Sequence, residues 1–547
     1  MLLDPATDAL FASDCALDGS TTCEAPSRHA SVGAEFDPFY VIDDGSLGSD
    51  SRAELAKTLE AGLRRFKVVF VPVALFADCR TVNGMARRIM ASVPSSDRRG
   101  RYRILGIGDA GFVALELANL QLAGGRQVEF LGLYNTRLAS INASSGNRIG
   151  AALSQHVIEH SAIRVSLFSR RDEFTAESGR AWTDVLGASR CTVHLLGDDG
   201  HKGEAGFASA LGASIQSCFD TSEPADADAA ESTYSPLMTI QSGVRGRVPY
   251  VCIPGAGASV VDFVPLAVAL GKEHPVHGLQ PRGMDGILLP YPTIEAAVEA
   301  YLPHVLGLCA HQKAVHLVGH SFGGWVAFEM ANRLTAEGVE VASLTILDSE
   351  PPAGFGRLGG EYTRPEALRE LVELLEMAAM RSTGLSLSDF EYKTLNDQLA
   401  VLHRRMVAIG LMPTRSNPGQ LLGTVRTFEA ALRTPYQPIS AYEGNARMVF
   451  VRNVGEIEAA TEARVCDAAA EWLKWLPEAD CRLGGGNHVT LLKPPHVDGV
   501  ARWLRDGALL PVVVGRARMR TAFGNLKGCS SAGSNGAEQR SAGAASR

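Results

Sequence analysis

The sequence predicts an α/β protein whose larger part is built on a mostly parallel sheet. Short strand-like apolar runs recur through the C-terminal half, at 250–253, 315–318, 344–347 and 448–451. Between them, stretches such as 325–336 carry apolar residues at helical spacing. Strands that alternate with helices favour a parallel sheet, because each helix returns the chain to the same end of the sheet.

Length, charge and cysteine spacing limit the possible classes of protein. A chain of 547 residues is longer than the usual ~100–200 residues of one domain, so we expect several domains. The net charge of −8 and the scattered basic residues give no reason to expect nucleic acid as a partner. The ten cysteines stand singly, without a CxxC pair or a Cys/His cluster, which predicts neither a disulfide framework nor a metal site. We expect no signal peptide, no membrane span and a cytoplasmic location.

Composition divides the chain into segments with different expected structures. Ser, Ala and Asp dominate the beginning, an acidic Pro-containing stretch interrupts the middle, and Gly, Ser and Ala dominate the end. We therefore expect a flexible leader at 1–35, a small helical segment at 36–95, a truncated α/β copy at 100–219, a linker at 220–243, a larger α/β domain at 244–510 and a disordered tail at 517–547.

An internal repeat relates the two sides of the expected linker. Residues 106–119 align with 319–332 at an offset of 213 positions, and two further matches follow in the same order downstream. Chance could produce one such match but hardly three. We interpret residues 100–219 as a partial copy of 312–500.

The pentapeptide Gly319-His-Ser-Phe-Gly323 follows a strand-like run and precedes a helical one. This is the context in which the G-x-S-x-G pattern forms a sharp turn that exposes the serine hydroxyl at the carboxyl edge of a sheet. Ser321 is therefore the candidate nucleophile, with a Gly/Ser turn that has no chemistry as the alternative. The oxyanion donors would be the amide of Phe322 and that of Gly255 or Ala256, in the loop after the first strand.

A serine nucleophile needs a base, and the base needs an orienting carboxylate. Asp348 ends the next strand and would lie at the same edge of the sheet, although it could also be a turn or cap residue. Three glycines precede His488, in a loop suited to a close approach to the nucleophile, so His488 is the candidate base. The alternative is a solvated loop histidine without a catalytic role. His320 adjoins the serine, His316 lies inside a strand and His496 begins a probable helix, so all three rank below His488.

The C-terminal motifs together resemble the thioesterase domains that end nonribosomal peptide and polyketide assembly lines. The resemblance covers residues 244–505 and rests on PYVCIPGAGASVVDFVPLA, HGLQPRGMDG, VHLVGHSFGGWVAFEMANRL, LTILDSEPP and GGGNHVTLL. It implies an α/β-hydrolase fold and a triad at Ser321, Asp348 and His488. It also implies an acyl or peptidyl substrate on the phosphopantetheine arm of a carrier protein, and a helical lid at about 350–442. Many relatives have His-Pro where this chain has Ile253-Pro254.

Leu47-Gly-Ser-Asp-Ser51 resembles the signature at which carrier proteins receive phosphopantetheine. Apolar residues at helical spacing follow, so Ser51 would head an amphipathic helix whose N-terminus favours a phosphate. We expect a carrier-like segment with phosphopantetheine on Ser51, the alternative being a capped helix without modification. Arg52 departs from the usual apolar residue.

The partial copy has lost the residues that the chemistry requires. Gly108 stands where the second copy has Ser321, Asn135 where it has Asp348, and only His201 remains. The first strand, its oxyanion loop and about 70 residues of lid would have no counterpart. We therefore expect a degenerate fragment without hydrolase activity.

These observations predict a serine thioesterase that releases a carrier-bound acyl or peptidyl chain by hydrolysis or macrocyclisation. The carrier would act in cis, through Ser51, or in trans. One alternative is a carboxylic-ester hydrolase acting on small free esters. A second, of another class, is a non-catalytic scaffold that docks carrier proteins.

Overall fold

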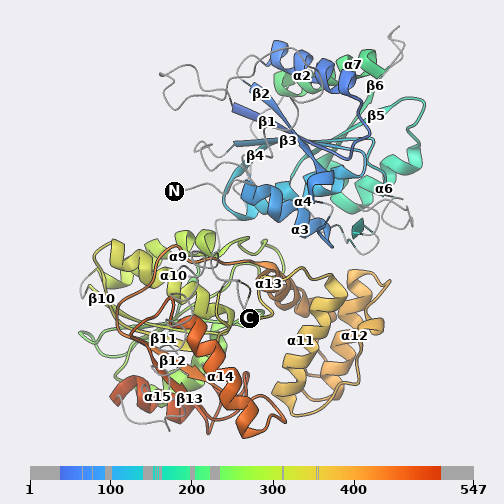
Figure 1. Cartoon of the computed structure of the whole chain (residues 1–547). Helices are drawn as coiled ribbons and strands as arrows, with labels where there is room; N and C mark the ends of the chain where they lie inside the picture. Colours follow the sequence, from blue (N-terminus) through green and yellow to red (C-terminus); the bar gives the residue numbers. More distant parts are fainter. Residues whose placement is uncertain are drawn as a thin grey trace, which may run out of the picture. The chain divides into compact units, whose positions relative to one another are not determined.

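The computed structural model divides into two compact units, unit 1 at residues 1–229 and unit 2 at 230–547 (Figure 1). It describes residues 37–92, 101–138, 163–196, 204–221 and 234–506, apart from 64, 65, 77, 311, 312, 353 and 355, together with 152, 153, 156 and 158. The expected leader and tail lie outside these residues. Among the described helices, none combines the length and apolar character needed to cross a bilayer.

Unit 2 contains a seven-stranded sheet with the order β13-β12-β11-β10-β8-β9-β7. Every neighbouring pair is parallel except β7 and β9. The strands are β7 (Leu237–Gln241), β8 (Tyr250–Ile253), β9 (Val276–Leu279), β10 (Ala314–His320), β11 (Glu340–Leu347), β12 (Ala446–Phe450) and β13 (Asp480–Leu483). The linker expected at 220–243 is therefore wrong at its C-terminal end, because 237–241 form the antiparallel edge strand.

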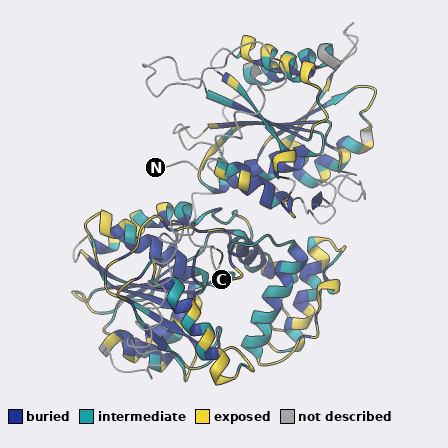
Figure 2. Cartoon of the chain, viewed as in Figure 1, coloured by how far each residue is buried: buried dark blue, intermediate teal, exposed yellow. Residues whose placement is uncertain are grey.

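Two hydrophobic cores lie on opposite faces of this sheet. Successive side chains of a strand point to opposite faces, so Val251 and Ile253 join one core while Tyr250 and Cys252 join the other. The first core also contains residues of α9 (Ile294–Cys309), α10 (Phe322–Ala336) and α14 (Glu458–Trp472), and the second contains residues of α8 (Val264–Leu270) and α15 (Val497–Asp506). Burial on both faces explains why the strands are continuous apolar runs (Figure 2).

The segment between β11 and β12 forms a helical layer. It contains α11 (Arg364–Ala379), α12 (Leu395–Ala408) and α13 (Leu422–Arg433), with short 3₁₀ turns at Leu387–Asp389 and Pro418–Leu421. A buried ion pair joins α11 to α13, because Arg364 Nε lies 2.7 Å from Glu429 Oε1. Tyr436, just after α13, donates its hydroxyl hydrogen bond to Glu329 of α10 at 2.9 Å. The ion pair thus joins two helices within the layer, and the hydrogen bond from Tyr436 attaches the layer to α10.

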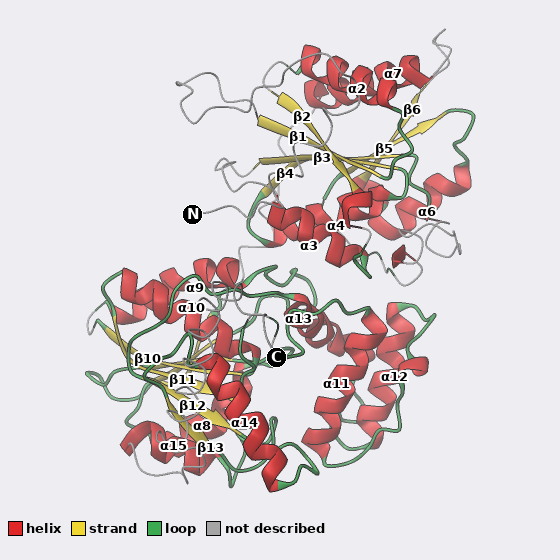
Figure 3. Cartoon of the chain, in the orientation of Figure 1, coloured by secondary structure: helices red, strands yellow, loops and turns green. Residues whose placement is uncertain are grey.

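The described residues of unit 1 form a second α/β layer structure rather than a helical segment followed by a fragment. Its six-stranded parallel sheet has the order β2-β1-β3-β4-β5-β6. The strands are β1 (Asp37–Asp43), β2 (Phe66–Pro72), β3 (Arg101–Ile107), β4 (Gln127–Tyr134), β5 (Val165–Arg170) and β6 (Cys191–Leu196). The helices α2 (Ser49–Gly62) and α7 (Glu204–Thr221) cover one face, and α3 (Val82–Ser92), α4 (Ala110–Ala123) and α6 (Ala176–Leu186) cover the other (Figure 3).

The expected helical carrier segment at 36–95 is therefore wrong. Strands β1 and β2 pair with each other from Asp37↔Phe66 to Asp43↔Pro72, and β1 also pairs with β3. Both strands are short apolar runs whose burial depends on the sheet around them, which is why a local pattern centred on Ser51 suggested a helical bundle. The bounds expected for the truncated copy, 100–219, are also too narrow. The copy begins at β1, because β1 and β2 belong to the same sheet as β3–β6.

The first strand of the C-terminal copy, β8, does have a counterpart in unit 1, contrary to the expectation. In unit 1, Ile42 of β1 pairs with Gly106 of β3. In unit 2, Ile253 of β8 pairs with Gly319 of β10. The loop after β1 therefore corresponds to the expected oxyanion loop after β8. The strand order matches as well, apart from the extra edge strand β7.

Candidate active site

The turn between β10 and α10 holds Ser321 in a left-handed backbone conformation. Its φ is 53° and its ψ is −127°, unusual for a residue with a side chain. The amide of Ser321 donates to Leu347 O at 2.9 Å, and its carbonyl accepts from Gly324 N at 2.8 Å. The first bond ties the turn to the end of β11, so Ser321 lies at the carboxyl edge of the sheet beside Asp348.

The glycines around Ser321 allow two backbone segments to meet. A Cβ on Gly319 would lie 2.3 Å from Gly323 O, and one on Gly323 would lie 2.2 Å from Ile253 O. A Cβ on Gly255 would lie 2.9 Å from Ser321 Cβ. The loop after β8 is thus packed directly against the turn of Ser321, which is where the predicted oxyanion donors Gly255, Ala256 and Phe322 would have to lie.

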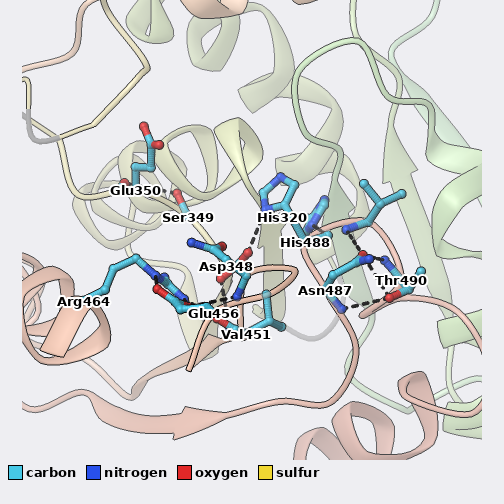
Figure 4. Close-up of polar contacts among 12 residues, drawn as sticks. His320, Asp348, Ser349, Glu350, Val451, Glu456, Arg464, Asn487, His488 and Thr490 are labelled. Carbon is cyan, nitrogen blue, oxygen red and sulfur yellow. Dashed lines mark hydrogen bonds and ion pairs between the residues drawn. The ribbon is translucent and has the colours of Figure 1, made fainter. Parts of the chain in front are cut away.

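Asp348 and His488 are in direct contact (Figure 4). Asp348 Oδ2 lies 2.7 Å from His488 Nδ1, and both side chains are largely buried, 11% and 23% exposed. Asp348 has a φ of 45°, and its Oδ1 accepts from Val451 N at 3.0 Å. Because Nδ1 is engaged by the carboxylate, Nε2 is the ring nitrogen left for a substrate or a serine.

The backbone around Asp348 is held by buried side chains. The indoles of Trp472 and Trp325 donate to the carbonyls of Ser349 and Glu350 at 2.9 and 2.8 Å. Both tryptophans are at most 1% exposed. A strained position persists only when its surroundings determine it, and these two hydrogen bonds supply that restraint.

A second restraint acts through Val451, whose amide binds Asp348. Arg464 Nη2 donates to Val451 O at 2.6 Å and to Glu456 Oε2 at 3.0 Å. The hydrogen bond from Arg464 is the main reason that the pKa of Glu456 falls to about 2. The ion pair is therefore present throughout the neutral pH range.

The loop that carries His488 has contacts on two sides. Asn487 is 6% exposed; its Oδ1 accepts from the amides of Val489 and Thr490 at 3.0 and 2.9 Å. Its Nδ2 donates to Met377 O of α11 at 3.3 Å. On the other side, His320 Nε2 lies 2.9 Å from His488 O. The loop is thus attached both to the helical layer and to the nucleophile strand.

The structure brings two of the three predicted catalytic side chains together and places the third at the same edge of the sheet. Within the described part of the chain, the Ser321 hydroxyl forms no hydrogen bond. Catalytic hydrogen bonds are often long in enzymes without substrate. His316 stacks on Tyr250 and lies 2.8 Å from Ser343 Oγ, inside the sheet as expected. Burial lowers the pKa of both His316 and His320 to about 4, so neither resembles a base poised near neutrality.

Unit 1 keeps the backbone of this site without its side chains. Gly108 has a φ of 57° and Asn135 a φ of 53°, close to the values for Ser321 and Asp348. Gly108 N donates to Tyr134 O at 2.9 Å, as Ser321 N does to Leu347 O. His201 lies outside the described residues. Unit 1 thus has the turn of the nucleophile but neither its hydroxyl nor the carboxylate.

In unit 1, a carboxylate binds the amide that corresponds to the predicted oxyanion donor of unit 2. Asp109 N, which corresponds to the amide of Phe322, donates to Asp44 Oδ2 at 2.8 Å. By strand register, Asp44 corresponds to Gly255, which has no side chain to do this. A donor that already binds a charged oxygen of its own chain is not available to a substrate. This plug is a feature that the sequence alone did not reveal.

Ser51, the expected phosphopantetheine site, lies in the first turn of α2 and is 1% exposed. Its hydroxyl is buried and has no hydrogen-bond partner in the described part of the chain. The adjacent Arg52 pairs with the buried carboxylate of Asp43, with Nη2 2.5 Å from Oδ2. A hydroxyl in this position is inaccessible to a modifying enzyme, so the structure contradicts the expected attachment site.

The match to a protein-family model lies in unit 2. The family model for the thioesterase domain matches residues 249–507. Atromentin synthetase invA2 of Paxillus involutus is 32% identical over 214 residues, 37% of this chain and 22% of that protein. Malpibaldin synthetase of Mortierella alpina is 35% identical over 119 residues, 22% of this chain and 2% of that protein. The chain thus spans less than a quarter of the length of either relative.

Solved structures of thioesterases are similar to about half of the chain. The wild-type Vlm2 thioesterase domain is 21% identical and covers 50% of this chain and 98% of its own, with a TM-score of 0.37. The type II thioesterase BorB from the borrelidin biosynthetic cluster is 21% identical over 49% of this chain and 95% of its own, with a TM-score of 0.35. These similarities are too distant to assign an activity.

Proposed function

We propose that unit 2, whose residues 249–507 match the family model for the thioesterase domain, releases an acyl or peptidyl chain from a carrier protein. The chain would arrive as a thioester on the phosphopantetheine arm of the carrier. Ser321 would take it as an ester, and water or a nucleophile within the chain would then release it as a free acid or a macrocycle. The relatives named as synthetases support a role in the synthesis of such chains.

The first half-reaction transfers the acyl group to Ser321. His488 Nε2 takes the proton of the Ser321 hydroxyl while Oγ bonds to the thioester carbonyl carbon. The carbonyl oxygen becomes an oxyanion that accepts hydrogen bonds from the amides of Phe322 and of Gly255 or Ala256. The C–S bond then breaks, and the thiol of the carrier leaves with the proton from His488. The Asp348 carboxylate stabilises the imidazolium during these steps.

The second half-reaction reverses the roles of the groups. His488 takes a proton from water, or from an amine or hydroxyl of the bound chain, as that nucleophile attacks the ester. The ester C–O bond breaks, and Ser321 recovers its proton from His488. Water yields a free acid, and an internal nucleophile yields a ring.

The observation that carries the proposal is the 2.7 Å contact between Asp348 and His488. These residues lie 140 positions apart in sequence, and a backbone hydrogen bond holds the nucleophile turn against the strand that Asp348 terminates. A carboxylate that fixes the tautomer of a loop histidine, at the sheet edge where a strained serine also lies, is the arrangement that nucleophilic acyl transfer needs.

The phosphopantetheine arm belongs, in this proposal, to a carrier protein other than residues 36–95. The sequence favoured Ser51, but a buried hydroxyl inside a sheet-forming segment cannot be reached by a transferase. Treatment with a broad-specificity phosphopantetheinyl transferase and coenzyme A should leave the mass of the protein unchanged. A mass gain that is lost in Ser51→Ala would restore the carrier role of Ser51.

The proposal is tested by intact-protein mass spectrometry after incubation with a panel of acyl-loaded carriers. We expect an acyl-enzyme mass in the wild-type chain and none in Ser321→Ala. Ser388→Ala removes an exposed serine of the helical layer and serves as the matched control, with wild-type acylation expected.

Two other outcomes would point to the alternative functions. Turnover of p-nitrophenyl esters without turnover of carrier thioesters would indicate a carboxylic-ester hydrolase. Failure of a fluorophosphonate to label Ser321 would indicate a scaffold that only docks carriers. Unchanged release by Ser321→Ala would refute the proposal outright.

A further inference from the structure

We propose that His320 is a positioning residue that holds the His488 loop in place by a hydrogen bond from its neutral imidazole. The inference rests on the proposed function and adds a residue to the same site. His320 is the last residue of β10, directly before Ser321, and is 9% exposed.

The direction of the hydrogen bond follows from its partners. His320 Nε2 lies 2.9 Å from the carbonyl oxygen of His488, and a carbonyl can only accept, so Nε2 carries the hydrogen. The two imidazole rings lie 4.9 Å apart with an angle of 36° between their planes (Figure 4). Burial, followed by the nearby charge of His488, keeps the pKa of His320 near 4, so its ring stays neutral.

His320 contacts the three parts of the site at once. It precedes the nucleophile in the chain, and it bonds the backbone of the base. A Cβ on Gly255 would lie 3.4 Å from His320 Nδ1 and 3.3 Å from His320 O, so the imidazole also packs against the oxyanion loop. A side chain here must fill this space and also present a donor at the Nε2 position to bond the His488 carbonyl.

The base needs such a bond because its loop has no regular structure. Residues 484–496 follow β13 as turns and bends, and three glycines precede Asn487. Asp348 holds the His488 ring at Nδ1, while His320 holds the His488 backbone at its carbonyl. Two anchors on opposite ends of one residue define where Nε2 points. A displacement of about 1 Å at a reacting group costs about 10²-fold in rate.

The test compares two substitutions at His320 in the full chain. His320→Phe keeps a ring but removes the donor, and we expect kcat for acyl-carrier hydrolysis to fall about tenfold to a hundredfold with KM little changed. The rate of fluorophosphonate labelling at Ser321 should fall by a similar factor. His320→Gln places an amide N–H where Nε2 was. We expect its kcat to be about tenfold higher than that of His320→Phe.

His316→Phe is the matched control. His316 is a second histidine of β10 and is partly buried, but it hydrogen-bonds Ser343 and stacks on Tyr250 rather than contacting the His488 loop. A purely structural role for the histidines of this strand predicts the same loss of kcat in His316→Phe and His320→Phe. Our proposal predicts a kcat within about twofold of wild type for His316→Phe.

The outcomes separate this inference from the proposed function. A wild-type chain that neither labels at Ser321 nor hydrolyses carrier thioesters contradicts the proposed function. Normal kcat in His320→Phe, or equal losses in His320→Phe and His320→Gln, contradicts the positioning role alone. If His320→Phe does not fold, His320→Asn replaces it in the test. The amide of Asn is too short to reach the His488 carbonyl, so we expect the same loss of kcat.

Discussion

At the scale of single residues, the site depends on two side chains held in a backbone conformation that favours glycine. Ser321 and Asp348 have φ values of 53° and 45°. Such positions cost about 1–3 kcal/mol each and persist only where the surroundings determine them. Here the restraints are the close glycine contacts around Ser321 and the indole hydrogen bonds after Asp348. The strain places both functional groups at the rim of the sheet.

The charge of Asp348 is the property that the proposed mechanism uses. Asp348→Asn keeps the size of the side chain and an acceptor for Val451 N, but its amide cannot stabilise an imidazolium and favours the wrong tautomer of His488. We expect kcat to fall by about 10³–10⁴-fold, with a melting temperature close to wild type. Steady-state hydrolysis of an acyl carrier measures the effect. A loss below about tenfold would show that His488 is oriented without the carboxylate.

At the scale of elements, the helical layer touches the site through two of its helices. Helix α13 packs on the oxyanion loop, because a Cβ on Gly257 would lie 2.9 Å from Phe428 Cβ. Helix α11 accepts the hydrogen bond from Asn487, the residue before the base. A movement of this layer would therefore act on the oxyanion donors and on His488 together.

Replacement of Asn487 by Asp separates the two roles of that side chain. Aspartate keeps the acceptor for the amides of Val489 and Thr490 but loses the donor to Met377 O and places a negative charge beside that carbonyl. Loss of such a bond costs about 1 kcal/mol, so exchange of amide hydrogens in the last turn of α11 should speed up about fivefold. Hydrogen-exchange mass spectrometry measures this, with α9 as the internal reference. Equal exchange in both proteins would mean that the bond does not restrain α11.

At the scale of the whole molecule, the chain contains two copies of one sheet, and only one copy has a serine and an aspartate at the predicted catalytic positions. Even the indole bond is retained in unit 1, where Trp182 Nε1 donates to Thr136 O at 3.0 Å, as Trp472 does to Ser349 O in unit 2. What differs is the set of groups at the rim. Unit 1 has Gly108 in place of the nucleophile and the Asp44 carboxylate on the oxyanion amide.

Because Asp44 binds the amide of Asp109, we expect that a serine introduced at position 108 would not restore reactivity to unit 1. In a Ser321→Ala chain, Gly108→Ser should yield no fluorophosphonate labelling. It should also lower the stability of unit 1 by about 1–3 kcal/mol, because the new Cβ would lie 2.1 Å from Asp44 Oδ2. Asp44→Ala should remove part of that cost, which a double-mutant cycle of urea unfolding measures. Labelling of the serine introduced at position 108 would contradict the inference that Asp44 blocks the oxyanion amide of unit 1.

Two histidines of β10, the buried His320 and the partly buried His316, make unit 2 less stable in acid. Their folded pKa values are about 4, below the ordinary value of 6.5, because burial disfavours the charged ring. Between pH 6.5 and pH 4 the unfolded chain therefore binds more protons than the folded one, and stability falls as pH falls. Each histidine contributes up to about 3 kcal/mol to this loss. Above pH 6.5 the effect is absent.

Urea unfolding followed by tryptophan fluorescence measures this loss, since four of the five tryptophans lie in unit 2. His316→Phe should reduce the fall in unfolding free energy between about pH 7 and pH 4.5 by roughly half. A fall as steep as in the wild type would mean that the titration of His316 does not contribute.

The sequence alone determined the fold class, the thioesterase resemblance and the candidate triad, because each depends on a local pattern. A strand followed by Gly319-His-Ser-Phe-Gly323 and a helix specifies the nucleophile turn wherever it occurs. The apolar runs of unit 2 are buried on both faces, which makes them continuous and easy to recognise. The repeat between the units was visible for the same reason.

Only the tertiary structure decided the features that depend on pairing between residues far apart in sequence. Whether Ser51 is exposed depends on β1 and β2, which are strands only because β3 and the rest of the sheet lie beside them. The Asp44 plug and the bond from His320 to His488 join residues 65 and 168 positions apart. No local periodicity encodes such contacts. They arise from strand order and register, which bring distant loops to one edge of a sheet.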